Sequence, residues 1–335
     1  MSWPRHIMQS VELQAVTQAR ASGDYHPGSN QWQVGISSIF ADALAIRPTK
    51  DNFWSVPTES NGKVPGTDQC EAPYNNSCGK LRGYGLVTEP FNRLQAAVST
   101  LTAGPVAPSD AVGKSDAALI LRSCMSDGTL LQPDRPARML DSAIAAAAFG
   151  DAALGPSGQV WATESAIGEG ETAQVFRYLF AAETSTPFAV GPDALGAGEM
   201  EGKHVAFEVN GTKSLQAFDA EHPIKLGVVA KYNFNLWTIA PVLEGGWALL
   251  GEAQTKWVAV SAKRFTRIDA DSTSLTVQMR GEAGESVEVW IVPPAAGQGE
   301  VAVAEPVSVG CVISGGGTAV LRAERDGARQ TTTCA

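Results

Sequence analysis

Basic residues are scarce in this sequence. Its 335 residues include 25 lysines and arginines against 35 aspartates and glutamates, which gives a formal net charge of -10. A chain with this excess of negative charge repels the phosphates of nucleic acids and of anionic membrane surfaces, so we expect neither nucleic acid nor membrane as a partner. The charge balance is compatible with uncharged ligands.

Long apolar runs are also missing. The most apolar stretch, residues 143–149, is short and rich in alanine, so the sequence predicts no membrane-spanning helix. The amino-terminal residues 1–6 contain no apolar signal core. If the true start lies upstream, this says nothing about secretion, and the sequence therefore leaves the cellular compartment open.

Clusters of metal ligands and common catalytic motifs are absent as well. The four histidines are scattered, with no Ser-His-Asp order, and no close Cys or His pairs have zinc-site spacing. No glycine-rich phosphate loop occurs. We therefore predict no metal and no cofactor. Cys70 and Cys78 flank a turn-rich loop and either close a small disulfide or remain free surface thiols.

Residues 1–141 contain apolar residues at helical spacing. Residues 31–46 carry Ile36, Ile39, Phe40, Ala43 and Leu44, which predicts a helix with these residues on its apolar face. A second helix is predicted near residues 90–101, capped by Thr88, with an apolar face made by Phe91, Leu94, Ala97, Val98 and Leu101. Residues 57–85 predict a long loop. Residues 117–122 fit a helix or a strand, and residues 143–148 fit a helix or a loop.

After residue 156 the pattern changes to short alternating runs separated by turns. Such runs predict strands at 159–163, 175–180, 204–209, 247–250, 257–261, 274–278 and 287–291. Evenly spaced strands of this kind are typical of an antiparallel β-sandwich. The tryptophans of this region are expected in its core rather than on its surface.

Three aspartates each follow the end of a predicted segment in the first part of the chain. Asp24 follows an alternating run at residues 11–17, which predicts a strand, and Asp51 and Asp110 follow later segments. In a β/α barrel, catalytic side chains collect at the carboxyl ends of the strands. The alternative is that each aspartate caps a turn through its own backbone hydrogen bonds.

The stretches around these aspartates resemble the sixth, seventh and eighth strand ends of the barrel in α-galactosidases and raffinose synthases. The matching runs are Arg-Ala-Ser-Gly-Asp-Tyr at 20–25, Pro-Thr-Lys-Asp-Asn-Phe-Trp-Ser at 48–55, and Ala-Gly-Pro-Val-Ala-Pro-Ser-Asp at 103–110. Asp-Gly-Thr-Leu-Leu at 127–131 also resembles the family's exit from the barrel. The sequence departs from the pattern where a single Asp24 stands for a double acid and where Lys50 replaces an aromatic residue.

This resemblance implies an α/β plus all-β fold. Residues 1–141 would form the last strands and helices of a (β/α)8 barrel, and residues 142–335 an antiparallel β-sandwich. The family's nucleophilic aspartate lies on the fourth strand, upstream of this sequence, so the resemblance implies that the amino-terminal half of the barrel is missing here. It also implies a retaining mechanism with a covalent glycosyl intermediate.

The resemblance assigns roles to six residues. Asp24 would be the general acid/base, so its surroundings are expected to favour the protonated form at the step in which the leaving oxygen departs. Lys50, Asp51 and Asp110 would hold sugar hydroxyls, and Arg20, four residues before Asp24, would hold a carboxylate or a sugar hydroxyl. Trp54 would stack on a sugar ring, because a flat aromatic face suits the C–H groups of a pyranose. The structural alternatives are an ion pair for Arg20, loop or turn caps for the others, and a core position for Trp54.

Two functions are therefore open from the sequence. The first is a carbohydrate-active enzyme, or its carboxyl-terminal part, acting on an α-galactoside or related α-glycoside, with an oligosaccharide or glycoside as substrate. Because the nucleophile is expected upstream, the isolated chain is predicted to have little or no activity. The second is a non-catalytic β-sandwich module that binds sugar or protein and carries a degenerate barrel remnant.

Overall fold

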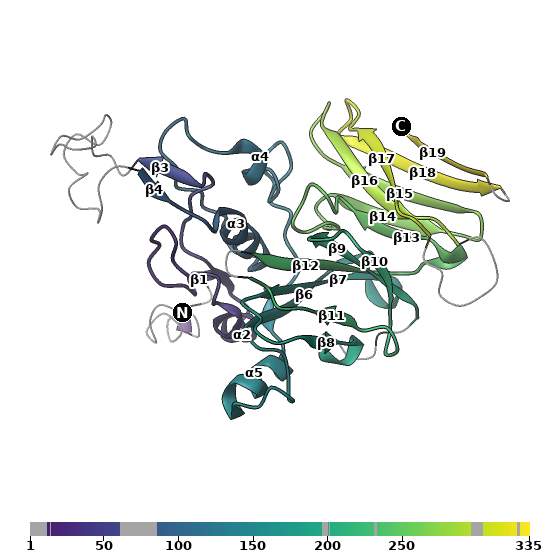
Figure 1. Ribbon diagram of the computed structural model, residues 1–335. Helices are drawn as coiled ribbons and strands as arrows, with labels where there is room; N and C mark the ends of the chain where they lie inside the picture. Colours follow the sequence, from purple (N-terminus) through teal and green to yellow (C-terminus); the bar gives the residue numbers. More distant parts are fainter. Residues whose placement is uncertain are drawn as a thin grey trace.

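The computed structural model describes residues 12–13, 15–60, 86–195, 200, 202–230, 233–295, 304–326 and 329–335. Strands in several antiparallel sheets make up most of its regular structure, and helices are few (Figure 1). The strand-rich carboxyl-terminal part therefore agrees with the alternating sequence pattern. The elements of the amino-terminal part lie at one side of the molecule, away from the last strands (Figure 1).

The amino-terminal part begins with a parallel strand pair. Strand β1 (Gln18–Arg20) lies beside β2 (Arg47–Thr49) in parallel, and helix α2 (Gly35–Ala43) connects them. The predicted strand at 11–17 is wrong in position, because a turn with a Val16 N to Leu13 O hydrogen bond precedes β1. Parallel pairing across a helix is the geometry that places consecutive strand ends at one edge of a sheet.

Helix α2 confirms the predicted helix but corrects its buried face. Ile36 and Phe40, expected to face inward, are 47% and 55% exposed. The buried residues are Gly35, Ser38 and Ala41. A side chain at Gly35 would collide with the indole of Trp161, so close packing there selects small residues and turns the large ones outward.

Helix α3 (Asn92–Leu101) lies as the sequence predicts. All five residues of its expected apolar face are buried: Phe91, Leu94, Ala97, Val98 and Leu101. The expected Thr88 cap is wrong, because the Glu89 carboxylate accepts the Phe91 backbone N–H at 2.8 Å instead. The short antiparallel strands β3 (Thr58–Ser60) and β4 (Leu86–Thr88) precede α3. The remainder of the predicted loop, with Cys70 and Cys78, lies outside the described residues.

After α3 the chain returns beside β2. Ser109 N donates to Phe53 O at 2.8 Å, Phe53 N donates to Ala107 O at 3.2 Å, and Phe53 and Pro108 form a parallel bridge. Gly104 lies so close to the Pro48 carbonyl that a β-carbon would collide with it. Within the described residues, parallel pairing is limited to these segments. They do not amount to a barrel.

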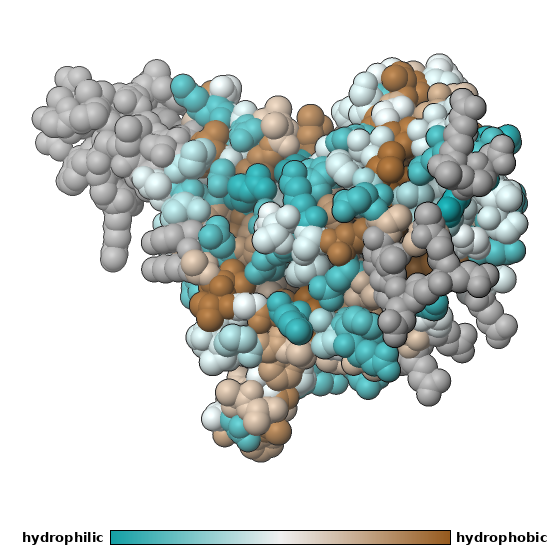
Figure 2. Space-filling model, turned by 45° about the vertical axis from the view of Figure 1, so that its right-hand side comes forward, coloured by the Kyte–Doolittle hydropathy of each residue, from teal (hydrophilic) through white to brown (hydrophobic). Residues whose placement is uncertain are grey.

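The connecting region contains two short helices that the sequence left undecided. Helix α4 (Ala117–Ile120) begins at Asp116, whose carboxylate accepts the Leu119 N–H at 3.0 Å. Helix α5 (Asp141–Phe149) follows the short strand β5 (Arg138–Met139) and ends at Gly150 in the left-handed conformation. Helix α5 projects from the lower edge of the molecule (Figure 1), and pale brown residues cover this tip in Figure 2.

The largest sheet is formed by strands from residues 138–241. Its order is β10-β9-β12-β7-β6-β5, and every neighbouring pair is antiparallel. Its bounds are β6 (Gln159–Ile167), β7 (Gln174–Ala182), β9 (His204–Asn210), β10 (Leu215–Phe218) and β12 (Phe234–Pro241). Strands β8 (Phe188–Val190) and β11 (Ile224–Leu226) pair separately. The short 3-10 helices are η2 (Gly170–Thr172), η3 (Pro192–Leu195) and η4 (Glu244–Gly246).

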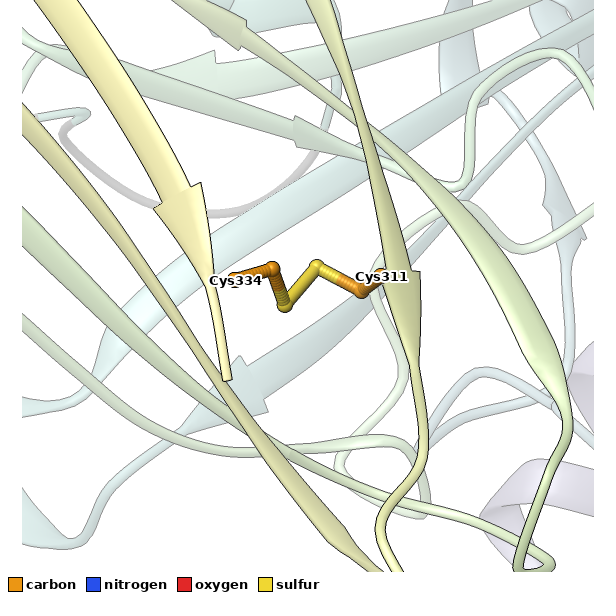
Figure 3. The surroundings of a disulfide bond; sticks show 2 residues. All are labelled: Cys311 and Cys334. Atoms are coloured by element: carbon orange, nitrogen blue, oxygen red, sulfur yellow. A yellow bond between two sulfur atoms is a disulfide. The ribbon is translucent and has the colours of Figure 1, made fainter.

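Two further antiparallel sheets contain the last strands. One has the order β13-β16-β17, with bounds Ala248–Gly251, Ser286–Val292 and Val307–Val312. The other has the order β14-β15-β18-β19, with bounds Phe265–Ala270, Ser274–Arg280, Thr318–Asp326 and Arg329–Cys334. A disulfide between Cys311 on β17 and Cys334 on β19 joins the two sheets, with 5.3 Å between the α-carbons (Figure 3).

Most of the predicted strands of this region are present, with one correction. Residues 257–261 are buried but do not form a strand, because their backbone groups bond elsewhere: Trp257 N donates to Arg122 O, and Val260 bonds to the Tyr178 hydroxyl. The expected tryptophan core is also present, since Trp161, Trp237, Trp247 and Trp257 are buried and Trp290 is half-buried.

Candidate functional site

Two neighbouring strand ends bring the first candidate residues together. Arg20 ends β1, and Lys50 and Asp51 follow β2 directly. The pairing continues past β1, since Ala21 N donates to Thr49 O at 2.8 Å, and Ser22 Oγ accepts the Asp51 N–H at 2.8 Å. The two loops therefore leave the sheet side by side.

Arg20 bridges two of the three candidate carboxylates. Its Nη2 lies 2.6 Å from Asp24 Oδ1, and its Nη1 lies 3.4 Å from Asp51 Oδ2. The Asp24 side chain is 77% exposed, whereas that of Asp51 is 21% exposed. Asp51 Oδ2 also accepts the Tyr25 N–H at 2.8 Å. The guanidinium thus holds one accessible and one largely covered carboxylate at the same strand edge.

A tyrosine connects this pair to helix α3 and to Trp54. The Tyr25 hydroxyl donates to Glu89 Oε2 at 2.6 Å and accepts the Trp54 N–H at 3.1 Å. Glu89 is fully buried and also accepts the Gly28 N–H at 3.1 Å. Burial raises the pKa of Tyr25, and the hydrogen bond to Glu89 raises it further, so the hydroxyl remains a donor.

Trp54 and Tyr25 form an aromatic corner above the strand ends. Their ring centroids are 6.5 Å apart in an edge-to-face arrangement, and both side chains are half-buried. Trp54 is therefore neither a core residue nor fully exposed. A half-buried indole has an apolar face and a fixed position, which are what stacking on a sugar ring requires.

Lys50 points into the protein rather than toward solvent. Only 3% of Lys50 is exposed, and its Nζ donates to Gln31 Oε1, Asp51 O and Asn52 O at 3.1, 3.0 and 2.8 Å. The ammonium also lies 5.3 Å from the ring centroids of Tyr25 and Phe53. Burial lowers the pKa of Lys50 to about 7, against the opposing effects of Glu89 and Asp51. These contacts fix both loops beneath the Arg20 pair.

Asp110 organises the loop that follows Trp54. Its Oδ1 accepts the Ser55 N–H at 2.6 Å, and its Oδ2 accepts the Ser55 hydroxyl at 2.7 Å. Ser55 is fully buried, and its hydroxyl oxygen also accepts the Asp116 N–H at 2.7 Å. Both oxygens of Asp110 therefore have protein partners, and the residue holds Ser55 directly after Trp54.

The six predicted residues thus form a connected neighbourhood with unequal access. Arg20 contacts both Asp24 and Asp51, and Tyr25 links Asp51 to Trp54. The polar side-chain atoms of Lys50 and Asp110 are bonded to protein. Sequence reasoning missed the roles of Gln31 and Glu89, because single polar residues of this kind have no characteristic spacing. Ser55 ends the motif at 48–55, but its bonds to Asp110 and Asp116 were not predicted.

One group of residues with metal-ligating side chains lies apart from this neighbourhood. In the described part of the chain, Asp219, Glu221 and His222 have ligand atoms within 4.8 Å of one another. Asp219 Oδ1 accepts both backbone N–H groups of Glu221 and His222 and lies 2.8 Å from His222 Nδ1. These bonds account for the group as a polar turn between β10 and β11.

Comparisons with known proteins leave the family open. Neither a protein-family model nor a curated protein matches this chain. None of the helices within the described ranges combines the length and the apolar character that a bilayer crossing needs.

Proposed function

We propose that this chain is the carboxyl-terminal part of a carbohydrate-active enzyme that acts on α-galactosides or related α-glycosides. In this proposal, β1, α2, β2, α3 and residues 104–110 are the last units of a (β/α)8 barrel. Residues 142–335, which include the two carboxyl-terminal sheets joined by Cys311 and Cys334, are its β-sandwich domain. The retaining mechanism, with a nucleophilic aspartate from residues outside this sequence, follows from the motif resemblance.

The observation that carries the proposal is the contact of Arg20 with both Asp24 and Asp51 at the ends of adjacent parallel strands. Catalytic carboxylates of sugar-cleaving barrels gather at this edge because parallel strands present their carboxyl ends together. The exposed apolar residues Ile36 and Phe40 on α2 give further support, since a neighbouring barrel unit would cover them.

Each accessible residue has a proposed task. Asp24 leaves its contact with Arg20 when a sugar enters, takes up a proton from solvent, and then donates this proton to the departing oxygen. Arg20 and Asp51 bind hydroxyls of the same ring, and Trp54 supplies an apolar face for the ring carbons. Lys50 and Asp110 position these loops from behind, since their polar atoms already bond to protein.

Calorimetric titration of the chain with methyl α-D-galactoside and raffinose tests the proposed binding site. We expect saturable binding that Asp51→Asn and Trp54→Ala weaken by about tenfold, which corresponds to about 1.4 kcal/mol. The matched control is Asp269→Asn, an exposed aspartate on β14 that pairs with Arg267. This variant should bind both sugars as the unaltered chain does.

Two outcomes would count against the enzyme proposal. If neither sugar gives saturable binding, the strand-end residues do not form a sugar site. If sugar binds equally well to Asp51→Asn and Trp54→Ala, it binds elsewhere, and the non-catalytic binding module becomes the better description. The isolated chain should not turn over an aryl α-galactoside, because no nucleophile is proposed within it.

The role of Asp24 needs a chain that includes the proposed upstream barrel strands. In that enzyme, Asp24→Asn should lower the hydrolysis of raffinose far more than that of an aryl galactoside, whose leaving group needs little protonation. Equal losses for the two substrates would assign Asp24 to binding rather than to proton donation.

A further inference from the structure

A cavity with several charged residues in its lining lies next to the loop that carries Ser55 and Pro57. It has a volume of about 560 Å³ and lies between the start of α3, the helix α4 and the turn after β13. The loop at 55–57 separates it from the candidate sugar site: Ser55 O accepts the Asn92 side-chain amide at 2.8 Å, and the Ser55 hydroxyl accepts the Asp116 N–H. Different residues therefore line the two sites.

Positive charge dominates the lining of this cavity. Arg93, Arg122 and Lys256 all line it, and Asp116 is the only acidic residue among the described residues that line it. Asp116 Oδ1 already accepts the Leu119 N–H as the cap of α4, and Lys256 Nζ donates to the carbonyls of Leu121 and Cys124. Of the charged residues that line the cavity, Arg93 and Arg122 are therefore the two that remain to interact with a ligand.

Both arginines contact the ring of the buried Trp257. The guanidinium carbon of Arg122 lies 4.0 Å from its centroid, and that of Arg93 lies 5.5 Å from it. A guanidinium over an indole face is attracted to the ring and keeps the N–H groups at its edge as hydrogen-bond donors. Two like charges near one ring repel each other, and an anion beside them offsets this repulsion.

The hydrogen bonds of Arg122 are incomplete within the described residues. Its Nη1 donates to Gln254 O at 2.8 Å, while its Nε is buried and has no acceptor. The Gln254 side-chain amide nitrogen, at the same cavity wall, is also buried without an acceptor. Burial and the charge of Arg93 lower the pKa of Arg122 to about 10. The Arg122 Nε and the Gln254 amide nitrogen have almost no accessible surface, so an anion in the cavity would contact the other nitrogens of the guanidinium. A half-buried guanidinium with a cationic neighbour is stabilised by such an anion.

We propose that this cavity binds the oxyanion of a small molecule, a carboxylate or a phosphate, through Arg122 and Arg93. The planar fork of Arg122 would hold two oxygens of the anion, and Arg93 at the rim would supply the second charge. The site is independent of the proposed glycosidase activity, because it uses neither Arg20 nor any of the candidate carboxylates.

Titration of the chain with inorganic phosphate and with acetate, at constant ionic strength in chloride, tests this proposal. Phosphate and acetate are separate arms, so the preferred oxyanion is read directly. We expect saturable binding of at least one anion, weakened by about tenfold or more in Arg122→Gln. Arg122→Lys keeps the charge but loses the planar fork of donors. Its affinity for the anion should therefore lie between that of the unaltered chain and that of Arg122→Gln. Arg267→Gln, an exposed arginine on β14 paired with Asp269, is the matched control and should bind normally.

The proposal is overturned if neither anion binds more tightly than chloride, or if Arg122→Gln binds as well as the unaltered chain. Circular dichroism verifies that each variant is folded. If Arg122→Gln does not fold, Arg93→Gln decides the matter, because exposed Arg93 has only its contacts with Asn210 and Trp257 to lose. Binding unchanged in Arg93→Gln would then exclude the site. Galactoside titration of the same variants keeps the two proposals apart, since neither arginine should affect it.

Discussion

Single residues in the candidate site divide into those that face a ligand and those that fix the loops. Lys50 belongs to the second kind, because its ammonium donates to three protein oxygens and is almost fully buried. The same burial that makes Lys50 an anchor also penalises its charge. The stability of the fold should therefore depend on the protonation of this one amine.

The pH dependence of Lys50 can be measured against a variant without the amine. The pKa of Lys50 is about 7 in the folded chain and about 10.4 in an unfolded one. Between these values the unfolded state binds more protons, so the free energy of unfolding rises with pH. As the pH rises above 7, the free energy of unfolding of the unaltered chain should increase, relative to that of Lys50→Met, by about 1.4 kcal/mol per pH unit. Urea unfolding across this range measures the difference.

The exposed Lys263 is the control for this measurement. Lys263→Met should show the same pH profile as the unaltered chain, since its amine is in solvent in both states. Parallel profiles for Lys50→Met and the unaltered chain would mean that the amine is not desolvated in the folded protein.

Tyr25 offers a second test at the scale of one atom. Tyr25→Phe removes the donor to Glu89, a fully buried carboxylate, and the acceptor for Trp54 N. The loss of a hydrogen bond by a buried charged group costs about 1–3 kcal/mol of stability, so the free energy of unfolding should fall by that amount. Urea unfolding provides the value.

A double-mutant cycle with Glu89→Ala, which removes the acceptor, isolates this contact. The coupling energy between Tyr25→Phe and Glu89→Ala should be favourable and a large part of the loss in Tyr25→Phe. Simple additivity of the two changes would show that the Tyr25 hydroxyl does not depend on Glu89.

At the scale of elements, a local sequence pattern predicts a helix or strand correctly where tertiary packing buries the same face that the pattern indicates. The helical spacing at 90–101 and the alternation at 159–163 and 287–291 correspond to α3, β6 and β16, because the periodic face is also the buried face. The pattern at 31–46 predicts the helix but not its orientation, since the close approach of Trp161 at Gly35 decides which side of α2 is buried.

Other element-scale features depend on contacts between distant residues and leave no local signal. Residues 257–261 alternate like a strand, yet bonds to Arg122 and Tyr178, both far away in the sequence, hold them in an irregular conformation. In the candidate site, short motifs indicate Arg20, Asp24 and Asp51 together, but the inward turn of Lys50 requires Gln31 and Tyr25 in their folded positions.

The pairing of Cys311 with Cys334 has the same non-local origin and gives an element-scale prediction. The bond joins β17 to β19 and closes a loop with a sequence separation of 23. Cross-links of this length stabilise by about 3 kcal/mol, mainly by restricting the unfolded chain. The double variant Cys311→Ser/Cys334→Ser should lose that amount in urea unfolding under oxidising conditions.

Reductant supplies the control for the disulfide. The unaltered chain with dithiothreitol should approach the stability of the double variant, and the double variant itself should respond little to the reductant. If the double variant is as stable as the oxidised chain, the cross-link between the two sheets contributes nothing.

On the scale of the whole molecule, a buried ionic network joins several of its parts. Arg264 is fully buried, and its guanidinium donates to Glu252 after β13 and to Glu285 before β16. It also donates to the carbonyl of Arg280 at the end of β15, and Glu285 accepts the Ser126 N–H from the segment after α4. One side chain therefore connects the two last sheets with the region that follows the candidate site.

Removing Arg264 should weaken all of these connections at once. Arg264→Met removes the guanidinium that is bonded to both Glu252 and Glu285, and breaking such a buried pair from one side costs about 3–5 kcal/mol. Burial already raises the pKa of Glu252 against the opposing charges of Arg264 and Lys256, so losing the guanidinium should favour its neutral form further. The measurement is the free energy of unfolding in urea.

Arg267→Met is the matched control, on strand β14, which begins directly after Arg264. Arg267 pairs with Asp269 at 2.7 Å, but both side chains are well exposed, so its loss should cost less than about 1 kcal/mol. If the two arginine variants lose the same small amount of stability, the network does not hold the sheets together.

A second comparison separates the loss of the arginine from the effect of leaving its acidic partners buried without it. Adding Glu252→Gln to Arg264→Met should recover part of the lost stability, because it removes a buried charge whose arginine partner is already absent. No recovery would indicate that Arg264 stabilises the fold through its bond to the Arg280 carbonyl and through packing rather than through charge.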